Sequence, residues 1–236
     1  MDAITAYQLT SMLEGYGLAE LVPMKTSSLA MQSNWKIYQE NSLEPYHTDV
    51  VHKTSHTPAP ANLSAFFDYT PGDGAIMTTT GFSGANELFA GGAEATLPHI
   101  EGLSPEQQGR ILFVAVLPSL FLVMEPGSVL VNLVLPHDAR TMTRLTFALY
   151  PRQAVAAPGF AAVAKAQAQA LDGIISEDQI TQEALQRGHK SRFTPKGTLS
   201  WLETTIPQMN AWLLERYRLA YASLREDASE PLRMRS

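Results

Sequence analysis

Four runs of β-branched, aromatic and aliphatic residues follow one another between residues 111 and 151. They read ILFVAVL, SLFLVME, SVLVNLVLP and TRLTFALYP, and short breakers such as Pro-Gly and Pro-His-Asp-Ala-Arg separate them. Runs of this kind are typical of strands, and connections this short join neighbouring strands in opposite directions. The pattern predicts an antiparallel meander and, together with helical segments on both sides of it, a single α+β domain.

Helices are expected before and after the meander, from apolar spacing and from residue composition. The expected helical segments are residues 4–22, 41–52, 154–173, 176–188 and 200–225. Ser176-Glu177-Asp178-Gln179 matches a capping box and predicts that the fourth segment begins there. Pro207 predicts a kink or a late start in the last one. Residues 22–38 suit extended segments, and the Pro- and Gly-rich stretch 53–110 suits a lid or binding loop.

Composition narrows the class of protein. The chain has 236 residues and a net charge of −6, which disfavours a broad basic surface for nucleic acid. It contains no cysteine, which excludes disulfides, thiolate zinc sites, cysteine nucleophiles and cysteine-bound iron–sulfur clusters held by this chain. The N-terminus shows no signal-peptide pattern, and the longest apolar stretch, 111–124, is too short to span a bilayer. We therefore expect a cytoplasmic protein with no membrane or nucleic-acid partner.

The segment NWKIYQENSLEPYHTDVVH, residues 34–52, places a carboxylate, Glu44, and two imidazoles, His47 and His52, close together. Two imidazoles with one carboxylate form the three-ligand face of non-haem Fe(II) oxygenases, which leaves positions open for O2 and substrate. On a regular helix five residues rotate a side chain by about 500°, which is a net angle of ~140° after one full turn. The two rings would therefore point in different directions. They converge on one metal only if the helix ends or unwinds between them.

Two other interpretations of these histidines stay open at this point. A histidine that is hydrogen-bonded in a partly buried helix is a commoner arrangement than a metal ligand. His52 and His56 have the better helical spacing for a pair, but Pro58 and Pro60 oppose a regular helix there.

The segment resembles the catalytic-domain motif of the Rieske non-haem iron oxygenases, the ring-hydroxylating oxygenase α-subunits. The matching residues are Asn34-Trp35-Lys36, Glu40-Asn41, Glu44, Tyr46-His47 and His52. A second signature of the family, an acidic pair followed by a glutamine-rich helix, is similar to residues 177–191. Its matching residues are Glu177-Asp178, Gln186-Arg187-Gly188 and Ser191. The order and separation of the two motifs also fit the family.

The resemblance implies that His47, His52 and Asp178 bind Fe(II). It also implies that Glu44 links a metal-bound histidine to a histidine of a neighbouring Rieske cluster, which gives a short electron route. Glu177 is the internal control, because it sits beside Asp178 on the predicted helix. If the interpretation is right, only Asp178 points inward. Candidates for outer contacts are Asn41 and Tyr46.

The family's α-subunits normally carry a Rieske domain whose [2Fe–2S] cluster is held by cysteines and histidines, and this chain has no cysteine. We therefore expect the cluster on another domain or a partner chain, with a reductase as the source of electrons. The resemblance implies that the chain forms a homo-oligomer, namely a trimer. The predicted catalytic domain is 1–225, followed by a polar C-terminal tail at 226–236.

By resemblance the fold is the helix-grip type (START/Bet v 1-like), in which a curved antiparallel sheet packs against a long C-terminal helix. Iron and an apolar substrate of aromatic character would lie between them. The expected reaction is monohydroxylation, cis-dihydroxylation or oxidative demethylation. The predicted cavity lining is Phe66, Phe67, Met77, Phe82, Leu88, Phe89 and residues of 111–135.

Three rival functions are compatible with parts of this pattern. A metal-free helix-grip domain that holds a hydrophobic ligand would have the same cavity without iron. A serine hydrolase is disfavoured, because Gly81-Phe82-Ser83-Gly84 is only a partial match to a nucleophile elbow. A zinc hydrolase with the same three ligands fits in principle, since geometry and metal availability decide metal identity as much as affinity does.

Overall fold

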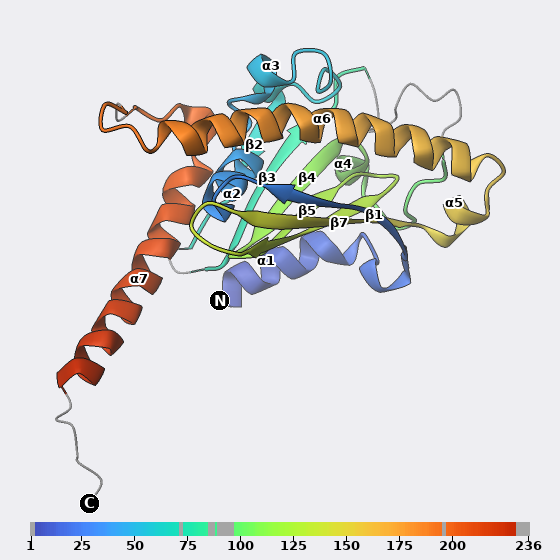
Figure 1. Ribbon diagram of the computed structural model, residues 1–236. Helices are drawn as coiled ribbons and strands as arrows, with labels where there is room; N and C mark the ends of the chain where they lie inside the picture. Colours follow the sequence, from blue (N-terminus) through green and yellow to red (C-terminus); the bar gives the residue numbers. More distant parts are fainter. Residues whose placement is uncertain (1–2, 71–72, 85–87, 89–96, 195–196, 230–236) are drawn as a thin grey trace, which may run out of the picture.

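The computed structural model describes the chain except for residues 1–2, 71–72, 85–87, 89–96, 195–196 and 230–236. Its centre is a seven-stranded antiparallel sheet with the strand order β1-β7-β6-β5-β4-β3-β2 (Figure 1). The strands are β1 (Val22–Met31), β2 (Ser64–Phe66), β3 (Ala75–Gly81), β4 (Arg110–Val116), β5 (Leu120–Met124), β6 (Val129–Pro136) and β7 (Met142–Tyr150).

The meander predicted for residues 111–151 is confirmed as β4 to β7, each paired with the next. Along β7 the side chains alternate strictly between buried and half-buried positions. Such alternation places every second side chain on the same face of the sheet. The residues of β7 that face the more deeply buried side therefore include Arg144, Thr146 and Ala148.

The stretch 53–110 is less irregular than its Pro and Gly content predicts, because it contains β2 and β3. All seven residues of β3 are buried. A strand that is covered on both faces shows no polar–apolar alternation, so the sequence signal for it is weak. Its threonines satisfy their hydroxyls locally; Thr79 Oγ1 donates to the carbonyl of Ile111 at 2.8 Å, and Thr78 Oγ1 to that of Ala65 at 3.0 Å.

Helices cover both faces of the sheet (Figure 1). Helix α1 (Ala3–Glu14) lies on one face, where residues of the loop after it pack with β3, β4 and β5. Helices α2 (Trp35–Leu43) and α6 (Phe160–Gly188) lie on the opposite face, over the larger part of the core. The remaining short helices are η1 (Leu18–Glu20), α3 (Thr48–Val51), η2 (Ala61–Leu63), α4 (Pro105–Gln108), α5 (Arg152–Ala156) and η3 (Trp201–Glu203).

Helix α6 is one continuous helix of 29 residues, where two helices were predicted. The expected capping box at Ser176 is wrong, because Ser176 Oγ donates to the carbonyl of Asp172, one turn earlier in the same helix, at 2.7 Å. A serine inside a helix commonly satisfies its hydroxyl in this way. The local match to a start signal therefore has no effect where the residues on both sides are already helical.

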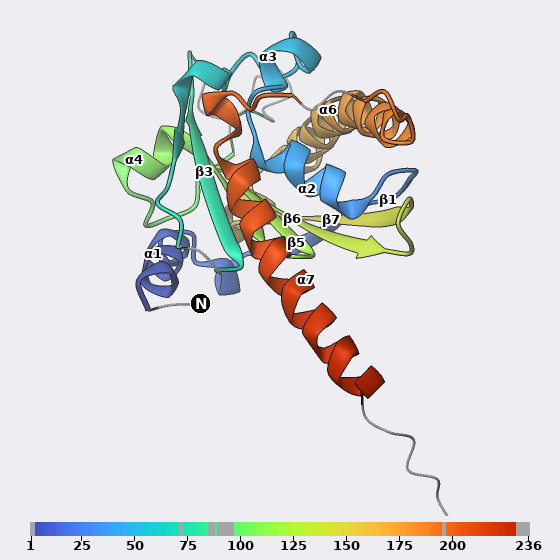
Figure 2. The ribbon, with the colours of Figure 1, turned by 90° about the vertical axis from the view of Figure 1, so that its left-hand side faces the viewer.

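Helix α7 (Thr205–Ser229) contains Pro207 in its first turn, as a late start predicts. Met209, Trp212 and Leu213 in its first half are buried in the core. The second half extends away from the sheet (Figure 2), and the helix continues past residue 225, where a polar tail was expected.

The architecture confirms the predicted α+β, helix-grip-like fold, with one refinement. The long helix that lies across the sheet is α6, and α7 packs against the sheet only through its first half (Figures 1 and 2). Among the described residues, no helix has both the length and the apolar character needed to cross a membrane.

Candidate metal centre

Pro45 divides the helix that the sequence predicted over 41–52. Helix α2 ends just before Glu44, whose backbone is extended (φ −113°, ψ 135°), the conformation that a residue before proline prefers. The short helix α3 follows, with His47 at its N-cap and His52 at its C-cap. The two imidazoles therefore stand at opposite ends of α3. The divergence expected for a regular helix does not arise.

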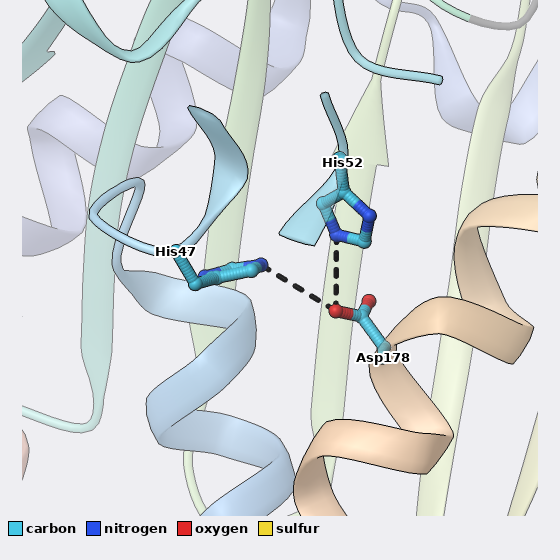
Figure 3. Close-up of side chains that lie close together, drawn as sticks. All are labelled: His47, His52 and Asp178. Atoms are coloured by element: carbon cyan, nitrogen blue, oxygen red, sulfur yellow. Dashed lines mark ion pairs between the residues drawn. The ribbon is translucent and has the colours of Figure 1, made fainter. Parts of the chain in front are cut away.

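His47, His52 and Asp178 point toward one another (Figure 3). Asp178 Oδ1 lies 3.4 Å from Nε2 of His47 and 3.0 Å from Nε2 of His52. One nitrogen of each ring and one carboxylate oxygen all lie within 4.8 Å of one another. The fold thus brings together, from α3 and α6, the three residues that the resemblance implied as ligands.

Asp178 lies in the interior of α6, so a favourable helix dipole at a first turn does not account for it. Its Oδ1 also accepts a hydrogen bond from Nδ2 of Asn41, on α2, at 3.0 Å. Burial raises the pKa of Asp178, but the hydrogen bonds from His47 and His52 outweigh it and hold the pKa well below the usual range. The carboxylate is therefore ionised and available as a ligand.

Each histidine is also held from its other side by a glutamate. Glu44 Oε1 accepts from Nδ1 of His47 at 2.7 Å, and Glu44 Oε2 accepts from the backbone N–H of His47 at 3.1 Å. Glu177 Oε2 accepts from Nδ1 of His52 at 2.7 Å and from Ser55 Oγ at 2.6 Å. A carboxylate on the second nitrogen leaves Nε2 free for a metal and fixes the ring.

The position of Glu177 corrects one expectation. The sequence predicted that Glu177 would point away from the site, so that its substitution would leave metal binding unchanged. Its side chain is 36% exposed, more than that of Asp178, yet it hydrogen-bonds the buried His52. Neighbouring positions on a helix are about 100° apart, which lets Asp178 and Glu177 reach Nε2 and Nδ1 of the same ring.

The hydrogen bonds also decide the charge of the histidines. Burial lowers the pKa of His47, but the hydrogen bonds to Asp178 and Glu44 outweigh it and raise the pKa to about 10. Burial lowers the pKa of His52 too, and its contacts with Asp178 and Glu177 reverse the shift, so the pKa is raised. In this arrangement protons on both rings occupy the positions toward Asp178 that a cation would otherwise take.

His56, the alternative partner for His52, is not part of this group. Its Nδ1 donates to the carbonyl of Ala59 at 2.8 Å, and its ring stacks on that of His52 with centroids 5.9 Å apart. Burial lowers the pKa of His56 to about 4, so the ring is neutral. The structure favours a packing role for His56 beside the site.

The family profile described as the ring hydroxylating alpha subunit (catalytic domain) matches residues 18–219. The chain belongs to this family. The match contains both motifs and every element from η1 to the first half of α7. Among the curated proteins compared with the chain, none matches it.

Solved structures of Rieske oxygenases share the fold of this ring-hydroxylating α-subunit domain. A quaternary ammonium Rieske monooxygenase, described for carnitine oxidation by gut microbiota and inter-subunit electron transfer, has a TM-score of 0.64 at 15% identity, covering 89% of this chain and 53% of its own. Dicamba monooxygenase has a TM-score of 0.59 at 16% identity, with 85% and 60% covered. Naphthalene 1,2-dioxygenase from Rhodococcus sp. has 0.57 at 15%, with 83% and 50% covered.

The chain therefore spans between half and two thirds of the length of these structures. The similarity at this level of identity establishes the fold of the domain. Its function is inferred from the family match and from the side chains of the centre.

The residues of the centre suit a single divalent metal ion. The donor set is two imidazole nitrogens and one carboxylate oxygen, which is the set used by mononuclear non-haem Fe(II) oxygenases. Both imidazoles have a carboxylate on Nδ1, which fixes the tautomer that presents Nε2 to a metal. The three ligand atoms converge, and the outer shell that a metal-bound histidine needs is already in place.

A cavity of about 110 Å³ opens beside the centre, between the sheet, α2, α3 and α6. Its apolar lining is Leu43, Ala59, Leu88, Phe113, Phe121, Val123, Leu130, Leu171, Ile174 and Ile175, and its polar lining includes Tyr38, Asn132 and Arg144. The prediction that strands within 111–135 line the cavity is therefore confirmed.

The individual lining residues predicted before β4 are mostly wrong. Leu88 lines the cavity, whereas Phe67 and Met77 pack in the core on the α1 face. Phe66 contacts the ring of Trp201, and Phe82 packs at the edge of the main core. Phe89 lies outside the described residues. Strand alternation decides the face of each residue, and β3 carries no alternation from which to infer it.

Proposed function

We propose that this chain is the catalytic part of a Rieske-type oxygenase, in which His47, His52 and Asp178 hold a mononuclear Fe(II). The observation that carries the proposal is the convergence of these three ligand groups at the edge of a largely apolar cavity. When bound, Fe(II) would supply the reductive activation of O2. The chain belongs to the ring-hydroxylating oxygenase family, so the proposed reaction is monohydroxylation, cis-dihydroxylation or oxidative demethylation of an organic substrate.

The protein itself holds the ligand side chains, orients the two imidazoles and excludes water from the substrate cavity. Glu44 and Glu177 orient the two imidazoles, and Asn41 holds Asp178 Oδ1. Phe113, Phe121 and Leu130 from the sheet, with Ile174 from α6, supply apolar walls against which a substrate packs. A dry wall of this kind limits the escape of reactive species into solvent. The scheme requires no protein acid or base.

Electrons are proposed to come from a [2Fe–2S] cluster on another domain or chain, because this chain has no cysteine to hold one. Glu44 is the proposed contact on that route. Both of its oxygens touch His47, and its side chain retains 11% exposure. A reductase would supply electrons to this cluster. Electron transfer across subunits, in a trimer by family resemblance, is consistent with the inter-subunit transfer described for the quaternary ammonium monooxygenase.

An isotope experiment tests the oxygenase proposal. Protein purified anaerobically and loaded with Fe(II) is expected to bind about one iron per chain. With a reductant, a Rieske partner protein and a panel of aromatic substrates under ¹⁸O2, it is expected to form product that carries ¹⁸O. A metal-free carrier would bind the same apolar compounds without iron. A zinc hydrolase would take oxygen from water.

Metal uptake is expected to strengthen as the pH rises. In the metal-free protein the pKa values of both imidazoles are raised, that of His47 to about 10, so both rings keep their protons to a higher pH than a free imidazole does. A metal must displace these protons, so proton competition weakens with increasing pH. Between pH 6 and 8 the apparent Co(II) affinity should rise by about tenfold or more per pH unit. Calorimetry in buffers of different ionisation enthalpy would measure the protons released, and an affinity that is flat or falls with pH would contradict the assigned protonation states.

A further inference from the structure

Arg144 is a buried cation in the wall of the cavity. It lies on β7 between Leu29 of β1 and Val134 of β6, and it is 6% exposed. The alternation of β7 turns its side chain toward the face that α2 and α6 cover, and it is one of the residues that line the cavity beside the metal centre. A guanidinium keeps its charge at any ordinary pH.

Among the residues that the structure describes, no carboxylate forms an ion pair with this guanidinium. Nε and Nη2 of Arg144 form no hydrogen bond, although both atoms are buried. The ion pairs among the described residues do not include Arg144. Burying a charge without a partner is unfavourable, and buried charges in proteins are normally paired. A ligand that arrives with the opposite charge would remove this penalty.

Other polar groups nearby are already engaged. Thr146, the next residue on the same face of β7, donates through Oγ1 to Oδ1 of Asn132 at 2.8 Å, and Asn132 donates through Nδ2 to the carbonyl of Phe121 at 3.3 Å. These bonds leave the Asn132 amide oriented by protein partners. The free hydrogen-bonding capacity in this part of the wall therefore belongs to Arg144.

Tyr38 relates Arg144 to the metal centre. Burial raises the pKa of Tyr38. The positive charge of Arg144 and the side-chain hydrogen bonds with Ser42 and Arg144 oppose this shift, and the negative charge of Asp178 adds to it. The Tyr38 hydroxyl thus lies within the electrostatic range of both side chains. All three line the same cavity. A ligand held by Arg144 would therefore share its space with the residues proposed to hold iron.

The geometry of the guanidinium edge formed by Nε and Nη2 of Arg144 favours one class of anion. Nε and Nη2 present two N–H donors on one side of the planar guanidinium, and this spacing matches the two oxygens of a carboxylate. We propose that the substrate is an organic carboxylate with an apolar body, whose carboxylate pairs with the Nε–Nη2 edge of Arg144 while its body packs on Phe113, Phe121 and Leu130. The proposal deepens the oxygenase function above and replaces the wholly apolar substrate expected from the sequence.

Binding of matched acids and amides tests this assignment without requiring turnover. The probes are benzoate and 1-naphthoate, each paired with its neutral amide, and the affinity for the full chain is measured by calorimetry with and without Co(II). The wild-type protein is expected to prefer the acids. Arg144→Gln should weaken acid binding by about 10- to 100-fold and change amide binding by less than about twofold. Arg144→Lys, which keeps the charge but loses the planar edge, should fall between the two.

Arg140→Gln is the matched control, because it removes the same charge from an exposed position just before β7; acid binding should be unchanged. Equal affinity of the wild type for acids and amides, failure of both acids to bind, or an Arg144→Gln variant that binds acids normally would overturn the proposal. If Arg144→Gln does not fold, the acid-over-amide preference of the wild type and of Arg144→Lys still decides it. Acid binding by a chain that takes up no metal would support the subsite while refuting the oxygenase function.

Discussion

Asp178→Ala is expected to abolish tight Fe(II) binding, with an affinity loss of more than about 100-fold. The variant removes one of three converging ligand groups, and ligand loss should exceed the 10- to 100-fold that outer contacts typically contribute. It also removes the anion that both imidazolium rings contact at 3.0 and 3.4 Å. Iron content after anaerobic loading, measured together with a Co(II) titration, checks the expectation.

Two further variants on the same helix serve as comparisons for the loss of metal affinity in Asp178→Ala. Glu177→Ala removes the acceptor for Nδ1 of His52 but no proposed ligand, so it should weaken metal binding by about 10- to 100-fold without abolishing it. Asp172→Ala removes an exposed carboxylate that is not part of the His47, His52 and Asp178 group, and metal affinity should stay at the wild-type value. Full iron content in a folded Asp178→Ala variant would refute the assignment of the ligands.

Glu44→Gln is expected to retain iron and to lose turnover that depends on the Rieske partner by about 100-fold. Glutamine keeps an oxygen that can accept from Nδ1 of His47, so the ring should stay oriented. It loses the negative charge and the second acceptor oxygen that a contact with a partner's histidine would use. Product formed per iron, with the partner protein as electron donor, is the measurement.

The matched measurement for Glu44→Gln replaces the partner by a small chemical reductant. If Glu44 serves the electron route, the variant should then recover most of its product yield, because the centre itself is intact. Complete loss of iron would show instead that Glu44 acts only as a support for His47. Unchanged turnover with the partner would remove Glu44 from the electron route altogether.

The sequence predicted the strands of 111–151 well, because their breakers and β-branched runs are local signals that act in the folded chain as they do in isolation. It failed where two local signals compete or where none exists. The capping-box match at Ser176 lies inside α6, since its neighbours are helical on both sides. Strand β3 was missed because burial on both faces leaves it without a period.

The candidate ligands followed from residue chemistry and family resemblance, whereas their outer contacts required the fold. Glu44 and His47 are three residues apart, so their hydrogen bond is local and could be anticipated. Glu177 and His52 are 125 positions apart, and only the packing of α6 beside α3 makes Glu177 a partner. Arg144 carries no signal in the sequence, since an arginine at an inward position of a strand is recognised only once its neighbours are known.

The sequence by itself determined the class of fold, the motif with its two histidines, and the need for a break in regular helix if both rings are to face one point. Those features depend on backbone preferences and on the order of residues along the chain. Only the tertiary structure decided that Glu177 holds His52 and that the buried cation Arg144 stands in the cavity wall. Contacts of this kind join elements far apart in sequence, and their energies depend on burial, which no local pattern specifies.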